Sequence, residues 1–270
     1  MAPALAYVVV LLVGPFLFLL WISVQEQDPL IAPHPTFTLS HYGAIFANRL
    51  YAESLLGTLQ LGISVTLITL VIGYPVAWFI AQSGSRLAGF VMVVVILPLF
   101  VSVVVRSFGW LVLLGRQGVV NQVLLALGLT DEPMRLLYTE TAVTVGLVHI
   151  LAPFMILPIA SVLRGLDAAI PEAARSLGAS WPKVFWTVIL PLSLPGVAAG
   201  AVLVLAHVIA AFVLPALIGS DRVRLMATMI WQQAMAANNL PMAAALAVVM
   251  VAATFLLLGV ANLFARDRHG

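Results

Sequence analysis

The chain has 270 residues, of which 63% are hydrophobic and only 8% are charged, and its mean hydropathy is +1.15. About a quarter of the residues in an ordinary soluble domain are charged, so this composition excludes a soluble domain and indicates an integral membrane protein. The net charge of +2 depends on few ionisable groups and gives no indication of nucleic-acid binding. The absence of cysteine excludes disulfides and thiolate metal sites, and no motif for another metal or a cofactor is present.

The long apolar stretches predict an all-α membrane protein, because each spanning helix needs about 20 apolar residues. We expect a single domain over residues 1–270, with both ends of the chain on one side of the membrane. Six transmembrane helices are predicted, over about 4–24, 55–81, 87–110, 141–163, 191–217 and 242–264.

The polar stretches between spans follow in chain order. Residues 25–53 are read as an external loop that contains a short interfacial helix in FTLSHYGAIF. In the second span, Gly73-Tyr74-Pro75 predicts a kink, which should face protein or a water-filled path because proline frees a backbone carbonyl. The third span passes Pro98. Residues 116–140 are a second external segment with an apolar helix over 119–129, and residues 219–241 are a third external loop.

The stretch 167–191, DAAIPEAARSLGASWPKVFWTVILP, is the one polar interruption in the second half that is long enough to fold by itself. Pro171 suits a first helical turn, where Asp167 and Glu172 place negative charge near the positive end of the helix dipole. Gly178 stands where a helix end commonly needs φ > 0, so the first helix should stop at Leu177.

A second short helix is predicted after that glycine. Ser180 offers a side-chain oxygen as its N-cap. The stretch ends in Leu190-Pro191, where we expect this helix to stop and the fifth span to begin. By helical spacing, one apolar face should carry Trp181, Phe185, Val188 and Ile189.

This helix-turn-helix resembles the cytoplasmic loop of the membrane-spanning subunits of bacterial binding-protein-dependent ABC importers. The family pattern is EAA, three residues, Gly, nine residues, then Ile-x-Leu-Pro, and Val188 in place of Ile is the one departure. The resemblance implies the type I permease fold, with this loop as a coupling helix that docks on an ATP-hydrolysing subunit. The residues to which it assigns ATPase coupling are Glu172, Ala173, Ala174, Leu177, Gly178, Trp181, Phe185 and Pro191.

Three further stretches resemble the polyamine branch of these permeases, which import spermidine or putrescine. They are SLLGTLQLGISVTLITLVIGYPVAWFIA, RSFGWLVLLGRQGVVN and FVLPALIG. The same branch includes relatives for iron, sulfate, thiamine, opines and aminophosphonates, so these solutes remain alternatives. The implied partners are a second permease subunit, two ATP-binding subunits that hold ATP and Mg²⁺, an extracytoplasmic binding protein and the lipid bilayer.

The charge count does not set the orientation by itself. Six basic residues lie on the side assigned to the cytoplasm and six on the outer side, although the positive-inside rule expects an excess inside. The orientation in a bacterial inner membrane, with both termini cytoplasmic, therefore comes from the coupling-loop resemblance.

Six residues are candidates for the substrate path: Tyr74, Arg106, Trp110, His149, His207 and Phe212. A charge beside an apolar span is costly, which marks Arg106 as functional, although it could snorkel to the headgroups. A lone intramembrane histidine is more often a hydrogen-bond partner between helices than a ligand. The aromatic rings, with Trp78, could attract the ammonium groups of a polyamine, but aromatics at span ends are commonly belt residues, which is the better interpretation for Trp78.

None of the ten acidic residues lies in the middle of a predicted span, so a carboxylate for a polyamine would come from the partner subunit. The chain has no GxxxxGK[ST] loop and therefore should not hydrolyse ATP. It also lacks the motifs of a metalloprotease or a serine hydrolase, and we expect a transport subunit and no enzyme. A stand-alone secondary transporter is the alternative from another class, but it would want an intramembrane carboxylate.

Overall fold

The computed structural model describes residues 2–26, 37–167, 169–219 and 223–266, and every regular element in this part of the chain is a helix. A single isolated bridge joins Gln25 and Phe37. Residues 1 and 267–270 lie outside the described residues, and with them the two chain ends that are predicted to lie on one side of the membrane. Residues 27–36 and 220–222 of the predicted external loops lie outside them as well.

Four helices in the described part are long and apolar enough to cross a membrane: Arg49–Gln82, Glu140–Arg164, Trp181–Ile209 and Leu240–Gly259. A bent pair, Arg86–Phe100 with Val103–Leu113, adds a fifth if it counts as one span. Helix α1 (Ala2–Ser23) is also apolar, over the shorter stretch Val9–Ser23.

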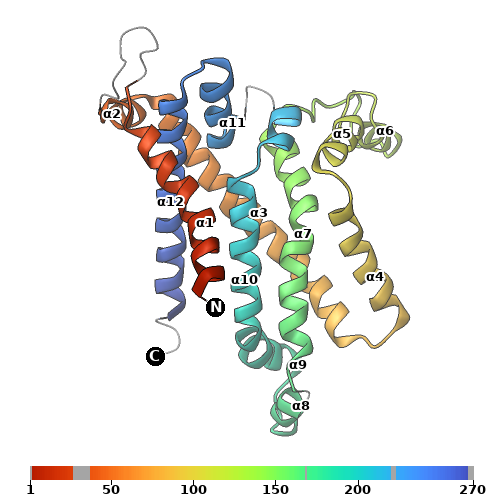
Figure 1. Cartoon of the computed structure of the whole chain (residues 1–270). Coiled ribbons are helices and arrows are strands. Elements are labelled where there is room, and N and C mark those ends of the chain that lie inside the picture. The colour runs from red at the N-terminus through yellow and green to blue at the C-terminus, as the bar shows by residue number, and fades with distance from the viewer. Residues whose placement is uncertain (1, 27–36, 168, 220–222, 267–270) are drawn as a thin grey trace. The chain divides into compact units, whose positions relative to one another are not determined.

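The chain divides into two compact units. Unit 1 comprises Met1–Leu59 and Arg224–Gly270. Here α1 and the short α2 (Ser40–Ala47) pack on α12 (Leu240–Arg266), as Figure 1 shows in red and blue. The region expected to be the third external loop instead contains α11 (Met226–Trp231) and a π-helical turn, η5 (Gln232–Ala236).

A buried threonine ties α11 to the first part of α3 (Arg49–Gln82). The Thr58 hydroxyl donates to the Ser54 carbonyl oxygen at 2.7 Å and accepts the Met226 backbone N–H at 2.9 Å. Because this N–H belongs to the first turn of α11, it has no partner within its own helix. Thr58 thus satisfies a helix end that would otherwise be left buried and unpaired.

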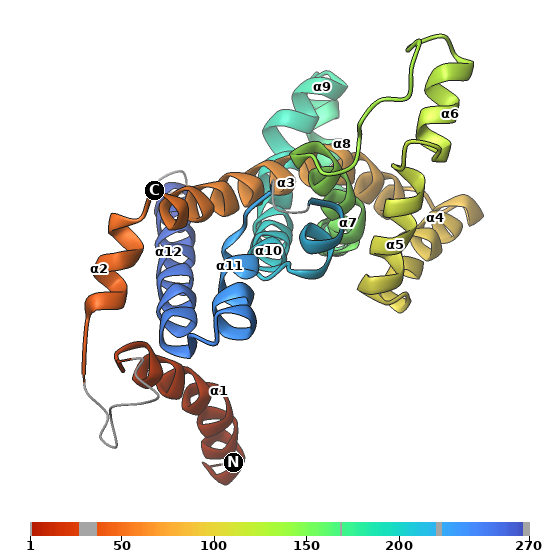
Figure 2. The same ribbon diagram turned by 90° about the horizontal axis from the view of Figure 1, so that it is seen from above.

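Unit 2, Gln60–Val223, is organised around α7 (Glu140–Arg164). Figure 2 looks along this helix and shows it between α10 (Leu190–Ile209) on one side and α4 (Arg86–Ile96) and α5 (Val103–Leu113) on the other. α7 and α10 lie close together because α10 carries two glycines where the helices meet. A Cβ on Gly200 would lie 2.8 Å from Met155 Sδ and 3.1 Å from its Cα, and one on Gly196 would lie 2.9 Å from the Pro158 carbonyl oxygen. The glycines of α10 therefore permit close packing of the two helices.

The third predicted span is not one straight helix. It divides into α4 (Arg86–Ile96), a 3-10 turn η1 (Leu97–Phe100) and α5 (Val103–Leu113), and the two parts meet at 104°. Pro98 cannot continue an α-helical ladder, and Ser102 then begins the next helix by accepting the Val104 backbone N–H at 3.3 Å. The bend therefore has local causes in a proline and a serine cap.

The second predicted span also contains a proline, but here the helix continues, and α3 includes Pro75. Tyr74 is buried on this helix, and a Cβ on Gly73 would lie 3.1 Å from Ile156 Cγ1 of α7. The stretch in which a kink is predicted therefore faces protein, as expected, and the helix continues through it.

The second helix of the 167–191 stretch does not stop before Leu190-Pro191. It begins as α9 (Trp181–Val184), widens into the π-helical η2 (Phe185–Ile189) and continues as α10. Pro191 has no N–H to offer, and the wide π turn just before it accommodates this loss. Residues buried along this helix accordingly lie five apart at Val184 and Ile189, then four apart at Ser193. The fifth span and the polar stretch are therefore one helix, and α10 ends at Ile209, before a turn and the π-helical η3 (Pro215–Gly219), short of the predicted Leu217.

Candidate functional site

The polar stretch folds as an elbow, which we define as α8 (Ala169–Ser176), the turn at Gly178 and α9. Asp167 Oδ1 accepts the Ala169 backbone N–H at 2.9 Å just before α8. At the other end, the Gly178 N–H donates to the Arg175 carbonyl at 2.9 Å and the Ala179 N–H to the Ala174 carbonyl at 3.2 Å. These two bonds, with a φ of +86° at Gly178, are a Schellman motif. The angle between α8 and α9 thus depends on a backbone conformation at position 178 that glycine adopts without strain.

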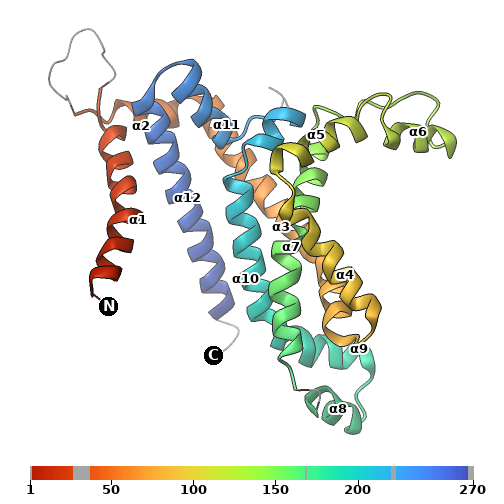
Figure 3. The same ribbon diagram turned by 45° about the vertical axis from the view of Figure 1, so that its right-hand side comes forward.

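The elbow presents its side chains outward, and Figure 3 shows it at the end of unit 2 away from α5 and α6 (Val119–Ala126). The Leu177 side chain is 89% exposed, while Glu172 and Ala173 are exposed and Ala174 is half-buried. The guanidinium carbon of Arg175 lies 6.0 Å from the centre of the exposed Trp181 ring. A shallow hollow of about 640 Å³ runs over the elbow, lined by Glu172, Arg175, Ser176, Gly178, Ala179 and Ser180. The elbow thus places an exposed leucine beside a hollow that is lined by charged and polar side chains.

Ser180 does stand at the N-cap position of α9, in an extended conformation, but its side chain makes no capping hydrogen bond. Its neighbour Pro182 is in the first turn, where one N–H is missing in any case. The predicted cap is therefore correct in position and wrong in its hydrogen bond.

A chain of aromatic rings connects the elbow to α3. Trp78 meets the rings of Trp181 and Phe185 edge-on, with centroids 6.1 and 6.0 Å away. Tyr74, one turn earlier on α3, meets Phe185 at 5.7 Å and forms a 2.8 Å hydrogen bond with Ser193 on α10. Tyr74 and Trp78 thus lie with the elbow, and Trp78 packs against protein rings.

A second group lies between α5 and α7. Trp110 Nε1 donates to His149 Nδ1 at 3.3 Å, with ring centroids 5.5 Å apart. Because Nδ1 accepts, the ring proton of neutral His149 is on Nε2. Arg106 lies one turn before Trp110 on α5, and its Nε and Nη1 are buried with no hydrogen-bond partner among the described residues. The structure therefore brings together two of the predicted path residues and places Arg106 on the same face of α5.

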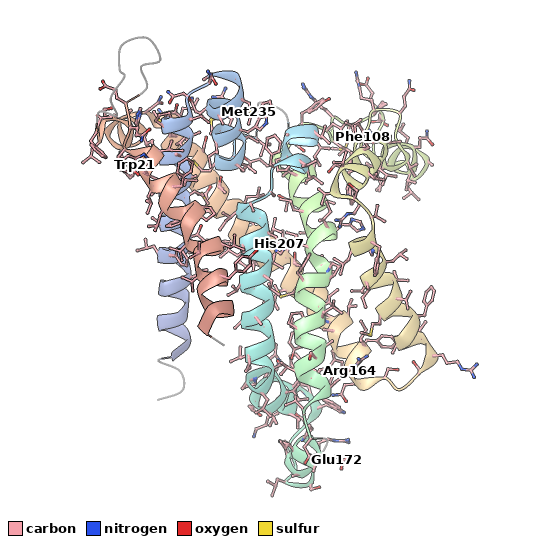
Figure 4. The ribbon with its side chains drawn as sticks, viewed as in Figure 1. Trp21, Phe108, Arg164, Glu172, His207 and Met235 are labelled. Atoms are coloured by element: carbon pink, nitrogen blue, oxygen red, sulfur yellow. The ribbon has the colours of Figure 1, made fainter. Side chains whose placement is uncertain are left out.

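The remaining two candidates lie on α10 and in the turn that follows it. His207 lies on α10 (Figure 4). Its ring stacks on Phe154 of α7 with centroids 4.2 Å apart, and its Nδ1 donates a proton to the Leu203 carbonyl oxygen at 2.8 Å. Phe212 is half-buried in the turn that follows α10. Tyr74, Trp110 and His207 thus have different ring partners, which are Phe185, His149 and Phe154.

Two residues of this architecture were absent from the candidates. Ser193 and Phe154 are a serine within an apolar run and a phenylalanine among prolines. Ser193 stands three residues before Gly196, so helical periodicity places the two on one face, and this spacing is the signal that could have found Ser193. The structure shows that Ser193 is buried. Nothing local marks Phe154, whose partner lies on another helix.

Comparison with known proteins decides the family. Residues 70–269 match the family described as binding-protein-dependent transport system inner membrane component. The chain belongs to this family. It is a multi-pass inner-membrane permease subunit of an ABC importer, a transport subunit and not an enzyme, which acts with a binding protein.

The relatives of this permease agree. It is 34% identical over 236 residues to the spermidine/putrescine transport system permease protein PotB of Escherichia coli (strain K12), covering 87% of this chain and 86% of that one. The protein of the same name from Haemophilus influenzae is 35% identical over 234 residues, covering 87% and 82%. Among solved structures, a bacterial ABC transporter involved in the import of alginate superposes with a TM-score of 0.80 at 20% identity, covering 98% of this chain and 93% of that one. The predicted all-α permease fold is therefore confirmed.

Proposed function

We propose that this permease forms half of the path by which a polyamine, such as spermidine or putrescine, enters the cell. The support is the printed function of relatives that share about a third of their sequence over most of the chain. The ring of Trp110 adds a group that attracts ammonium. Permeases for aminophosphonates, opines, iron, sulfate or thiamine remain the alternatives within the same branch.

The assembly that we propose contains a second permease, two ATP-binding subunits that carry ATP and Mg²⁺, and an extracytoplasmic binding protein. The whole chain would act as one permease domain in the bilayer, with both termini in the cytoplasm. The single observation that carries this assignment is the elbow, which projects an exposed leucine and a hollow rimmed by Glu172 and Arg175.

The elbow would dock on an ATP-binding subunit, and different residues would have different roles in this docking. Exposed Glu172, Ala173 and Leu177 form the contact surface, and Gly178 fixes the angle between the helices. Trp181 and Phe185 pass movement to Trp78 and Tyr74 of α3 through their ring contacts. Half-buried Ala174 accepts the Ala179 N–H at its carbonyl and so closes the turn. Pro191 follows the π-helical turn by which α9 continues into α10.

The substrate path that we propose includes Arg106, Trp110, His149, His207 and Phe212, with Tyr74 acting through its helix contacts. The part of this path on the present chain contains Arg106, whose Nε and Nη1 have no hydrogen-bond partner among the described residues, and no carboxylate in the middle of a predicted span. Without a partner, this positive charge would repel a polyamine. The second permease therefore has to supply acidic groups, both to neutralise Arg106 and to face the amine. A weak site of this kind suits transit, because tight binding would slow release.

The test is reconstitution of this chain alone and with its partners. We expect the isolated chain to hydrolyse no ATP, and the complete complex to hydrolyse ATP faster when a spermidine-loaded binding protein is added. Stimulation by a sulfate- or phosphonate-binding protein instead would replace the solute and leave the permease assignment standing. Uptake driven by an ion gradient without ATPase subunits would favour a secondary transporter.

A further inference from the structure

A cavity of about 400 Å³ lies at the end of unit 2 that is farthest from the elbow. It is lined by Leu114, Arg116, Arg135, Leu136, Leu137 and Tyr138, from the turn after α5 and the loop before α7. The 25 residues of α7, about 37 Å of helix, separate this loop from the stretch that leads to the elbow. Figure 1 shows α5 and α6 at one end of unit 2 and α8 at the other.

One buried side chain holds the two loops together. Asn121 of α6 (Val119–Ala126) is fully buried, and its Nδ2 donates to the carbonyls of Gly115 and Met134, both at 3.0 Å. Its Oδ1 accepts the Met134 N–H at 2.9 Å. Arg116 directly follows Gly115, and Arg135 directly follows Met134. Asn121 therefore delivers one arginine from each loop to the same cavity.

The backbone around the cavity is also costly to build. A Cβ on Gly118 would lie 2.3 Å from the Leu113 carbonyl oxygen, so the turn after Arg116 needs a glycine there. Tyr138 has a φ of +64°, which is unusual for a residue with a side chain, and its N–H donates to the Ile218 carbonyl at 2.8 Å. Strained positions of this kind persist where the surrounding structure fixes them, and they gather at functional sites.

Both arginines lack a charge partner within the described residues. Neither forms an ion pair or a side-chain hydrogen bond there, although Asp131, Glu132 and Glu140 lie close in sequence. Both arginine side chains are exposed, so an anion from outside can reach them. Two like charges that line one cavity repel each other less once an anion lies between them. The geometry therefore selects an anion that two guanidinium groups can share, as a carboxylate can.

On the basis of the proposed function, we infer that this cavity receives an aspartate or glutamate side chain of the extracytoplasmic binding protein. The cavity lies at the end opposite the elbow, which is the end that a binding protein would meet. The stretch 114–140 contains two arginines and three carboxylates, a net charge of −1, which disfavours an anionic membrane surface. A single projecting carboxylate avoids that repulsion because it enters between the arginines.

The experiment uses the complete transporter in nanodiscs of phosphatidylcholine, with the binding protein of the same system, loaded with spermidine, as the probe. The concentration of binding protein that gives half-maximal ATP turnover is measured for the wild type and for Arg116→Gln/Arg135→Gln. We expect this concentration to rise about tenfold, with maximal and unstimulated turnover unchanged. Arg86→Gln is the matched control, since Arg86 is exposed at the start of α4 near the elbow end.

A half-maximal concentration within about twofold of the wild type would overturn the inference. A difference that arises only when phosphatidylglycerol is added to the nanodiscs would assign the cavity to a lipid headgroup and overturn it as well. If the double variant does not assemble, each single glutamine variant is titrated in its place, with the same criterion. A wild-type complex that no binding protein stimulates would contradict the proposed function, whereas a stimulated wild type with an equally stimulated variant contradicts this inference alone.

Discussion

The hydroxyl oxygens of Tyr74 and Ser193 lie 2.8 Å apart, in a hydrogen bond that joins α3 to α10 across 119 residues of chain. The Ser193 hydroxyl also lies 2.9 Å from the Leu190 carbonyl oxygen, which can only accept. Because a serine has one hydroxyl proton, it donates to Leu190 and accepts from Tyr74. Both side chains are buried, at 8% and 0% exposure.

This direction predicts unequal costs for the two deletions. Tyr74→Phe leaves Ser193 its donated bond and should lower the free energy of unfolding by about 0.5–1.5 kcal/mol. Ser193→Ala leaves a buried phenol proton without an acceptor and should cost about 1–3 kcal/mol. The midpoint of thermal unfolding in one detergent tests the order, with Ser83→Ala as a control on an exposed hydrogen bond. A smaller loss for Ser193→Ala than for Tyr74→Phe would reverse the donor assignment.

Gly178→Val should uncouple the transporter without unfolding it. No atom lies within 4 Å of a Cβ at this position, so the cost is the backbone strain of φ +86°, of order 1–2 kcal/mol. Relief of that strain would turn α9 relative to α8 and displace the docking surface. We expect pairing with the second permease to be retained, co-purification of the ATP-binding subunit to weaken and uptake to be lost. Gly89→Val, at an equally open site in α4 with ordinary φ, should leave all three unchanged.

Glu172→Lys should also weaken the ATP-binding subunit, for an electrostatic reason. Lysine in the first turn of α8 opposes the helix dipole, at a cost of about 0.3–1 kcal/mol, and reverses the charge at the hollow. Glu172→Gln is the matched variant, because it removes the charge without opposing the dipole. Stimulated ATP turnover and uptake should fall in the order wild type, Gln, Lys. Full uptake by both variants would mean that the elbow is merely a connector.

Trp110 can be divided into its ring and its indole N–H. Trp110→Ala removes both and should raise the KM for spermidine uptake about tenfold, the loss of an attraction worth about 1–2 kcal/mol. Trp110→Phe keeps a ring and removes only the bond to His149, so we expect most uptake to remain. Phe108→Ala, an exposed ring two residues earlier on α5, is the control for loss of a ring (Figure 4). Equal KM values for Trp110→Ala and Phe108→Ala would remove Trp110 from the substrate path.

The elbow could be predicted because its signals are local. Pro171, Gly178 and the spacing between them specify two helices and the turn that joins them. The bend before Ser102 has local causes too, but hydropathy does not reveal it, because the run is apolar on both sides of Pro98.

Contacts between helices gave no such signal. Trp78 and Trp181 meet edge-on although 103 positions separate them in the sequence, and no periodicity in one chain pairs them. The same holds for Trp110 with His149. Their residue types could be predicted as unusual in a span, but their partners depend on how α3, α5 and α7 pack.

The π-helical turn at Phe185–Ile189 has a consequence for how this protein can vary. One residue corresponds to about 100° of rotation in an α-helix, so deleting a single position there would swing the elbow by about that angle around α10. Most substitutions in the turn leave this angle alone, because it is encoded by the number of residues and not by their side chains. Insertions and deletions of one residue should therefore be far less tolerated between Val184 and Ser193 than exchanges of side chain at the same positions.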